Sequence, residues 1–374
     1  MTPSTANLTL SPTGNPPRAD QSVIAALGQF GPEFTAAVAS GLLPAISEPD
    51  ALRYVQQLAG SHYENFSVLS SLVPLAVRPD FAAVYAFCRW SDDLGDETGS
   101  DQAARDRSSQ LLGWWRTELA ECFAGTPRHP VFTALLPTIR RHALPFEPFS
   151  DLITAFEQDQ TVTRYQTWSQ LCDYCRNSAN PVGRLVLYLA GHRPENDTVI
   201  ATTQDGQPLT RFDCSDRVCT ALQLTNFWQD ARRDLTDRDR VYLPSDETGF
   251  TADDLRTWLS QGENAAVRLR YIQAVRPLVD RTREMFDSAS MLPEHINPGF
   301  APVVWLFAAG GRHVLERVEA TGCTTLWQRP RIGKLSKALL VGRAWIRARR
   351  AAPSTLQSPA ASITATAVAP ESAA

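Results

Sequence analysis

Apolar residues recur every three or four positions along most of this chain, which is the period of an α-helix that buries one face. The pattern is clear in residues 111–123, 171–189 and 266–286. Breaks that contain proline or glycine separate the helical stretches, at residues 125–127, 144–148, 191–194 and 293–298. No run of strictly alternating residues indicates a sheet. The sequence therefore predicts an all-α fold.

Three stretches depart from this period. Residues 1–20 are polar and contain four prolines, and residues 351–374 are rich in Ala, Ser, Thr and Pro, with Glu371 as their only charge. Segments of this composition bury too little apolar surface to stay ordered. We therefore expect both ends to be disordered and one domain to span residues 21–350. Residues 194–213 are polar and contain an Asp205-Gly206 turn signal, which favours an irregular loop.

Two short acidic runs stand inside apolar helical sequence. Asp92 and Asp96 follow the apolar run 81–90, and Asp230 and Asp234 follow the run 218–228. Residues four apart lie on one face of a helix, and two carboxylates there repel each other and lose hydration on burial. Such a pair needs a compensating cation. Mg²⁺ is typically held by one or two carboxylates together with substrate phosphate, so the pattern indicates diphosphate chemistry.

The second acidic run extends a polar stripe on one helix face, made by Gln223, Asn226, Asp230 and Asp234. A solvated face is the commonest reason for a pair of Asp residues at this spacing, because Asp is mostly exposed in proteins. The apolar neighbours on the other faces favour a wet cavity instead. The two acidic pairs lie 138 residues apart on separate predicted helices, and we predict that both face one cavity.

Composition describes an ordinary soluble globular protein of 374 residues, 43% of them hydrophobic and 20% charged. A net charge of −4 argues against a nucleic-acid partner, because no basic field would hold a phosphate backbone. The seven cysteines lie in apolar segments and indicate small buried side chains in a reducing compartment. No apolar run approaches the ~20 residues of a membrane span, and the N-terminus lacks the pattern of a signal peptide. We expect a cytoplasmic protein.

Residues 329–350 carry eight basic residues and no acidic one, interleaved with apolar side chains. Two interpretations stay open. This segment is either a core-packed terminal helix with a solvated basic face, or a helix that lies on the surface and makes peripheral contact with anionic lipid.

The two acidic runs resemble the motifs of the squalene/phytoene synthase family of head-to-head prenyltransferases. Tyr85-Ala86-Phe87-Cys88-Arg89, which leads into the first pair, is similar to the family's first aspartate motif. The stripe of the second pair, followed by Arg240-Val241-Tyr242-Leu243-Pro244, is similar to its second. The resemblance covers residues 60–345. It implies a single-domain, all-α isoprenoid-synthase fold with a central cavity.

Finer features resemble the bacterial hydroxysqualene synthases of hopanoid biosynthesis, and they lie in residues 61–66, 175–184 and 226–230. Gln229 stands where phytoene synthases and presqualene diphosphate synthases usually have Arg, and Asn180-Pro181 stands where they tend to have Ala-Gly. The resemblance therefore implies Mg²⁺-dependent conversion of presqualene diphosphate and water to hydroxysqualene and diphosphate. It also implies two pathway partners, a presqualene diphosphate synthase and a squalene-forming oxidoreductase.

Two other functions stay open. One keeps the fold and couples two prenyl diphosphates, as a presqualene diphosphate, squalene or phytoene synthase does. The other is a non-catalytic homologue that uses the pocket to bind lipid or a partner. Intact aspartates at all four motif positions argue against the second.

The site residues follow partly from the pattern and partly from the resemblance. The pattern predicts four Mg²⁺ ligands: Asp92, Asp96, Asp230 and Asp234. Asp93 lies one position off their stripe, which favours a supporting role through hydrogen bonds. Arg89 shares a face with Asp92 and either reaches the diphosphate or forms a plain salt bridge.

The resemblance adds Asn226 to the metal ligands and Tyr174 to the four catalytic aspartates. Substrate binding is expected from Asn65, Phe66, Arg89, Asp93, Asn180, Gln223, Asn226 and Tyr242. The carbocation left after ionisation needs an aromatic lining, because one cation–π contact contributes ~0.5–2 kcal/mol. The candidates are Phe66, Phe87, Trp90, Phe227 and Trp228, and we expect only one or two of them to face the cation. Candidates for directing the attacking water are Glu64, Asn65 and Asn180, whereas His62 is expected to be structural.

Overall fold

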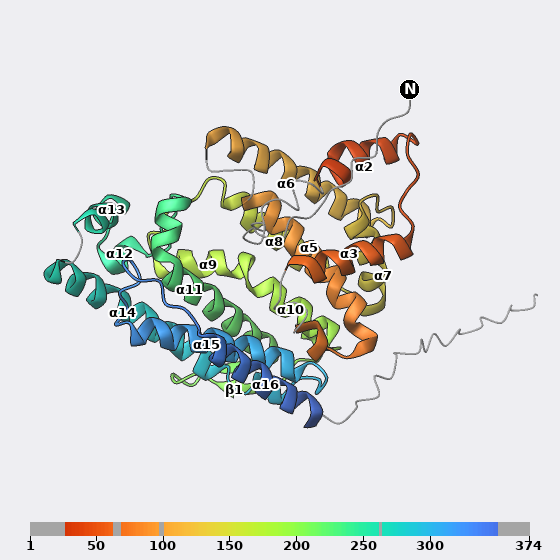
Figure 1. Ribbon diagram of the computed structural model, residues 1–374. Coiled ribbons are helices and arrows are strands. Elements are labelled where there is room, and N and C mark those ends of the chain that lie inside the picture. Colours follow the sequence, from red (N-terminus) through yellow and green to blue (C-terminus); the bar gives the residue numbers. More distant parts are fainter. Residues whose placement is uncertain (1–26, 63–68, 97–100, 262–263, 351–374) are drawn as a thin grey trace, which may run out of the picture.

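The computed structural model describes residues 27–62, 69–96, 101–261 and 264–350, and these fold almost entirely into α-helices (Figure 1). The predicted all-α class is confirmed. The ends that were expected to be disordered, 1–20 and 351–374, lie outside the described residues. The first half contains α2 (Pro32–Ala39), α3 (Glu48–His62), η1 (Leu75–Val77), α5 (Arg78–Asp96), α6 (Gln102–Phe123), α7 (Pro130–His142), α8 (Glu147–Gln158), α9 (Trp168–Ser178) and α10 (Asn180–Leu189).

The second half is built around one long helix, α11 (Arg211–Asp237), which begins at a capping box formed by Thr210 and Asp213. It continues with α12 (Ser245–Thr248), α13 (Ala252–Ser260), α14 (Ala265–Ser288), η3 (Leu292–Glu294), α15 (Ala301–Ala320) and α16 (Lys334–Arg350). Helices α10, α14 and α15 all pack against α11. In Figure 1, α16 lies outermost, along α15.

The expectation of an irregular loop at residues 194–213 was wrong. This stretch forms the short turn η2 (Pro194–Asn196) and an antiparallel hairpin of β1 (Val199–Thr202) and β2 (Pro208–Thr210). Asp205-Gly206 makes the turn, and Gly206 has φ +85°, which favours glycine. The strands are too short for a clear alternation. They are held by pairing with each other and by contacts with α11.

Two glycines let α11 approach its neighbours closely. A Cβ on Gly183 of α10 would lie 2.5 Å from both Cys219 Sγ and Ser215 Oγ, and a Cβ on Gly311 of α15 would lie 2.2 Å from Leu222 Cδ2. Real Cβ atoms do not come this close to other atoms. The glycines are therefore required for the observed spacing of α10, α11 and α15.

An aromatic cluster fills the core between α5, α6 and α7. The ring centroids of Trp90 and Trp115 lie 5.3 Å apart, and those of Phe87 and Trp115 lie 6.0 Å apart. Trp90, Phe87 and Trp115 have no exposed surface. His129 lies against both tryptophans, and burial lowers its pKa to about 3. Phe87 and Trp90, which were candidates for a cation-facing lining, are thus core residues.

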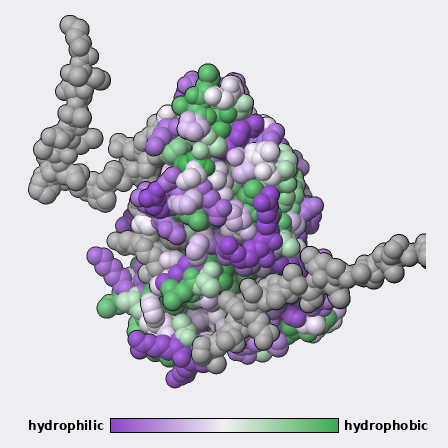
Figure 2. All heavy atoms as spheres, turned by 90° about the vertical axis from the view of Figure 1, so that its right-hand side faces the viewer, coloured by the Kyte–Doolittle hydropathy of each residue, from purple (hydrophilic) through white to green (hydrophobic). Residues whose placement is uncertain are grey.

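The surface mixes polar and apolar side chains, and on the face shown in Figure 2 small hydrophobic areas lie among hydrophilic ones. None of the described helices is both long enough and apolar enough to span a bilayer. The seven cysteines form no disulfide; four are buried, as expected, and three are partly buried.

Candidate active site

Helix α5 carries the first acidic pair near its C-terminal end. Arg89 Nη1 lies 3.3 Å from Asp92 Oδ2, and the same guanidinium forms a salt bridge with Asp93. The Asp93 side chain is 1% exposed, whereas that of Asp92 is 44% exposed. Arg89 therefore forms the salt bridge that was one of its two expected roles. Asp93 points inward and holds that arginine, while Asp92 remains accessible to a ligand.

The last residue of α5, Asp96, meets the segment that follows α11. Arg238 Nη1 lies 2.9 Å from Asp96 Oδ2, and Arg240 Nη1 lies 3.2 Å from Asp96 Oδ1. Both arginines come within six residues of Asp234. The backbone N–H of Arg240 donates to the Asp234 carbonyl oxygen at 2.9 Å, so Arg240 contacts both acidic residues. The two acidic helices therefore meet at one place.

Helix α11 carries the second acidic pair, one turn apart. Asp234 is 9% exposed, and burial, followed by the charge of Asp230, raises its pKa to about 7. Asp230 is paired with Arg329, which lies just before α16, with 3.1 Å between Arg329 Nη2 and Asp230 Oδ2. Next to it, Gln229 Nε2 donates to the carbonyl oxygen of Pro330 at 2.8 Å. The segment that precedes α16 is thus fastened to this face of α11.

A third carboxylate, Asp159, lies buried beside Arg240. Asp159 Oδ2 accepts a hydrogen bond from Tyr174 Oη at 2.8 Å and lies 3.6 Å from Arg240 Nη1. Burial raises the pKa of Asp159 to about 7, although Arg240 opposes this shift. Burial alone would lower the pKa of Arg240, but Asp159, Tyr242 and Asp96 raise it above its ordinary value. This network links Tyr174 to the first acidic pair.

Three helix ends converge here, which explains why two arginines are needed. Asp96 ends α5, Asp159 caps the C-terminal end of α8, and Asp234 lies in the last turn of α11. The C-terminal end of a helix carries partial negative charge, so a carboxylate there is unfavourable without a cation. Together with Arg105, Arg238 and Arg240 line a small cleft of about 30 Å³ at this point. The cleft combines acidic groups with cations suited to phosphate.

A group of packed aromatic rings, called the aromatic wall below, lies beside Arg240. The rings of Phe227 and Tyr242 stack with their centroids 3.7 Å apart, and the Tyr174 ring lies 6.1 Å from that of Phe227. Tyr165 lies 5.6 Å from Tyr242 and completes the group. Trp228, by contrast, is fully buried and donates to Thr282 Oγ1 at 2.9 Å. Of the aromatic candidates, Phe227 alone among the described residues belongs to this wall.

An apolar cavity of about 210 Å³ opens between α10, α11 and α15. Its walls include Val186 and Leu187 of α10, Val218 of α11 and Phe307 of α15. Gln223 also lines it, one turn before Asn226 on the polar stripe. An apolar chamber therefore borders the N-terminal half of α11, two turns before Asp230.

The remaining predicted residues divide into three groups. Asn180 is buried, and its Oδ1 accepts a hydrogen bond from Thr220 Oγ1 at 2.9 Å, so it ties α10 to α11. Asn226 is exposed on α11. Glu64, Asn65 and Phe66 lie outside the described residues, as does the side chain of His62.

The donor set fits a hard divalent cation. The carboxylate oxygens of the two pairs are the ligand type that Mg²⁺ prefers, and Mg²⁺ commonly takes one or two carboxylates while phosphate completes its shell. The described part of the chain holds no cluster of three or more His, Cys, Asp or Glu side chains that could bind a metal alone.

Four residues of this site were not predicted: Asp159, Arg238, Arg240 and Arg329. The signal for Asp159 was its position after the apolar helical run 149–156, where a helix end disfavours an acid. Arg238 and Arg240 stand four and six residues after Asp234, within reach of that carboxylate. Arg329 gave no local signal, because its partner lies 99 residues away.

Known proteins of one family resemble this chain. A family model described as squalene/phytoene synthase matches residues 59–336, which include both acidic pairs. A phytoene synthase of Arthrospira platensis is 28% identical over 303 residues, covering 80% of this chain and 94% of that protein. A hydroxysqualene synthase of Zymomonas mobilis is 32% identical over 241 residues, covering 62% of this chain and 70% of that protein.

Solved structures show the same helical fold. The crystal structure of squalene synthase HpnC from Alicyclobacillus acidocaldarius superposes with a TM-score of 0.62 at 37% identity, over 74% of this chain and 95% of that one. A dehydrosqualene synthase in complex with a ligand also gives a TM-score of 0.62, at 21% identity, over 81% of this chain and 98% of that one.

Proposed function

The chain belongs to the squalene/phytoene synthase family, and from this premise we propose that it converts presqualene diphosphate and water to hydroxysqualene and diphosphate. Members of this family are prenyltransferase-like synthases, so the chain is expected to be an enzyme. The observation that carries the proposal is the meeting of two acidic helix ends with Arg238 and Arg240. Such a place offers carboxylates to a divalent cation and guanidinium groups to a diphosphate, and the separate cavity between α10, α11 and α15 offers apolar surface.

The four aspartates are the proposed holders of Mg²⁺, with Asn226 beside Asp230 on the exposed stripe. When bound, Mg²⁺ supplies charge neutralisation for the oxygens of the departing diphosphate. Arg238 and Arg240 orient those oxygens, because a guanidinium donates two parallel hydrogen bonds to phosphate. The carbon–oxygen bond breaks heterolytically, and the electron pair leaves with diphosphate.

The aromatic wall is proposed to shield the resulting cation. The ring of Phe227, which follows Asn226 on α11, stacks on the ring of Tyr242, and the outer face of such a pair attracts positive charge. The apolar cavity holds the prenyl chains and excludes bulk water. A single water then attacks the rearranged cation and loses one proton, which yields the alcohol.

One comparison supports this product, because the hydroxysqualene synthase relative is 32% identical. The HpnC structure, at 37% identity, is that of a squalene synthase and supports C30 chemistry without distinguishing the product. Gln229 and Asn180, the branch-specific positions, both make defined contacts, with Pro330 and Thr220 respectively. An arginine at position 229 would add a positive charge one residue from Asp230, which would change the balance of charge at the second acidic pair.

Turnover of defined substrates tests the proposal. Purified protein, presqualene diphosphate and Mg²⁺, without NADPH, should release a C30 alcohol that mass spectrometry identifies. Asp230→Asn should abolish release, whereas the matched control Asp253→Asn, at an 89% exposed side chain on α13, should leave it unchanged. Absence of the alcohol from the unmodified protein contradicts the proposal.

A second candidate is the coupling of two prenyl diphosphates, which the phytoene synthase relatives favour. Incubation with farnesyl diphosphate or geranylgeranyl diphosphate alone distinguishes coupling from the conversion of presqualene diphosphate. A C30 product from the first substrate, or a C40 product from the second, indicates coupling. A folded protein that turns over none of these substrates would favour the non-catalytic homologue instead.

We further propose peripheral membrane contact through residues 329–350, with the presqualene diphosphate synthase and the squalene-forming oxidoreductase as pathway partners. The support is chemical. Both the substrate and the product carry long apolar chains that partition into a bilayer.

A further inference from the structure

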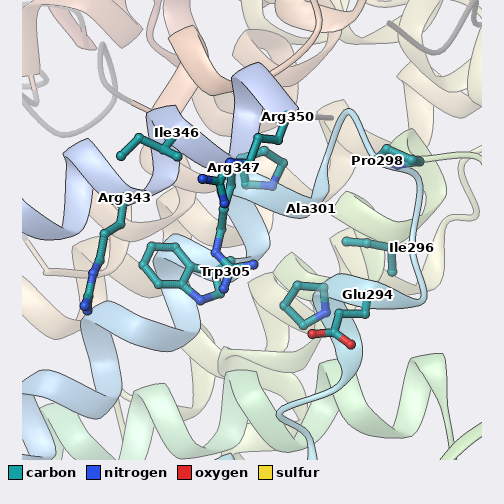
Figure 3. A pocket seen from close by; sticks show the side chains of 11 residues that line it. Glu294, Ile296, Pro298, Ala301, Trp305, Arg343, Ile346, Arg347 and Arg350 are labelled. Atoms are coloured by element: carbon teal, nitrogen blue, oxygen red, sulfur yellow. The ribbon is translucent and has the colours of Figure 1, made fainter. Parts of the chain in front are cut away.

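A groove of about 700 Å³ lies between the start of α15 and the end of α16 (Figure 3). One wall comes from η3 and the loop after it, including Glu294 and Ile296, and the floor includes Trp305 of α15. The other wall is α16, which contributes Arg343, Arg347 and Arg350 with Ile346. None of these residues lines the cleft of the acidic helix ends or the apolar cavity.

The groove is positively charged. Arg343, Arg347 and Arg350 follow one another at i, i+4 and i+7, so they share one side of α16. Within the described residues no carboxylate forms a salt bridge with any of the three. The Arg347 guanidinium instead lies 4.7 Å from the centroid of the Trp305 ring, a contact that positions the side chain but leaves its charge uncompensated. Glu294 is the single acidic residue of the lining.

The outward face of α16 is apolar. Leu335, Leu339 and Ile346 stand at i, i+4 and i+11, which is one stripe, and they are 82%, 69% and 52% exposed. Ala344, on the opposite face, is the only buried residue of the helix. Trp345 is 42% exposed beside the stripe. The helix therefore points its apolar stripe away from the protein, with basic residues on its flanks.

This pattern is typical of a helix that lies in the surface of an anionic membrane. A solvated helix would carry its charges on the outer face, whereas an interfacial helix has apolar residues outward, basic residues at the flanks and Trp at the headgroup level. Residues 329–350 have eight basic residues and no acidic one, which complements anionic lipid.

We propose that α16 docks on an anionic phospholipid surface, with the apolar stripe of Leu335, Leu339 and Ile346 at the interface and one lipid phosphate in the arginine groove. The proposal deepens the membrane contact stated under the proposed function, and it specifies the residues and the lipid charge. Its occupant is a bilayer, because the stripe and the groove lie on one helix and can be engaged together.

Vesicle flotation of the full-length protein tests the docking directly. The protein should float with vesicles of phosphatidylcholine and phosphatidylglycerol and stay unbound with phosphatidylcholine alone. The double variant Arg343→Gln/Arg347→Gln should lose about 25-fold in partitioning, because each arginine near an anionic surface contributes about fivefold. The matched control Arg107→Gln/Arg140→Gln loses the same charge from exposed positions on α6 and α7 and should bind normally.

The apolar stripe has its own test. Leu335→Ser/Leu339→Ser should weaken flotation while all arginines remain, whereas Leu269→Ser, at a 56% exposed leucine on α14, should not. Equal binding to both kinds of vesicle, or normal binding of the arginine double variant, would overturn the proposal. Arginine-dependent binding of inorganic phosphate without vesicle binding would show a soluble-anion site, and self-association through the stripe would show a protein interface; either result overturns it.

Failure of this proposal and failure of the proposed function give different results. Flotation needs no substrate, so a protein that floats without turnover contradicts only the reaction. A protein that releases the alcohol from detergent-solubilised substrate but does not float contradicts only the docking.

Discussion

Arg329 offers a direct test of whether the second acidic pair binds metal. Its guanidinium forms a bidentate pair with Asp230, the carboxylate that we expect to ligate Mg²⁺. The arginine and a metal ion compete for the same oxygens. Replacing it, as Arg329→Gln, should therefore raise the affinity of the substrate-free protein for a divalent cation.

The expected change in cation affinity follows from the solvent exposure of the two side chains. The Arg329 side chain is 42% exposed and that of Asp230 is 18% exposed, so solvent screens the pair. Pairs of this kind contribute about 0.2–1 kcal/mol, which corresponds to at most a fivefold change in affinity. The free energy of unfolding should fall by no more than this amount, so the variant remains folded for the measurement.

Mn²⁺ titration by calorimetry, without substrate, measures the change. Arg312→Gln is the matched control, because the Arg312 side chain is 40% exposed, close to the 42% of Arg329, and pairs with Asp287 between α15 and α14, outside the acidic pair. Both variants lose one positive charge. An equal affinity change in the two variants, or weaker Mn²⁺ binding by Arg329→Gln, would refute the reasoning.

Three further predictions concern stability. Arg240→Met should lower the free energy of unfolding by about 3–5 kcal/mol, because it leaves the buried Asp159 without its cation. In urea titrations, adding Asp159→Asn should restore part of this loss. No recovery in the double variant would argue against the ion pair. Burial lowers the pKa of His129 to about 3, against 6.5 when unfolded, so the unfolded chain binds the extra proton between these values. Stability should then fall as pH drops through this window, by up to ~1.4 kcal/mol per pH unit, and His129→Asn should flatten that slope. Gly183→Ala should cost about 1–3 kcal/mol through overpacking, whereas Gly113→Ala, where a Cβ meets open space, should be neutral or stabilising in thermal melts.

Helical period and proline or glycine breaks predicted the fold class well, because both are local signals. The hairpin of β1 and β2 was missed for the same reason: strands of four and three residues carry too few positions for an alternation to appear. Period also cannot tell which buried face meets a cavity and which meets another helix. Phe87 and Trp90 share the apolar face of α5 and lie in the aromatic core, whereas Phe227 lies against Tyr242.

The candidate site was only partly visible in sequence. The acidic pairs can be recognised in the sequence, because two carboxylates at i and i+4 repel each other and need a compensating group. Their arginine partners cannot be recognised in this way, because Arg240 is 144 residues from Asp96 and Arg329 is 99 residues from Asp230 along the chain. Such partners become evident only when the chain is folded.

The central claim is that the carboxylates of α5 and α11 hold divalent metal together with diphosphate. Crystals grown with Mn²⁺ and inorganic diphosphate, measured at the manganese absorption edge, test it most directly. The account predicts anomalous peaks at the carboxylates of Asp92 and Asp96 and at those of Asp230 and Asp234, with diphosphate between them. Ordered diphosphate elsewhere, or manganese peaks away from all four carboxylates, would contradict it.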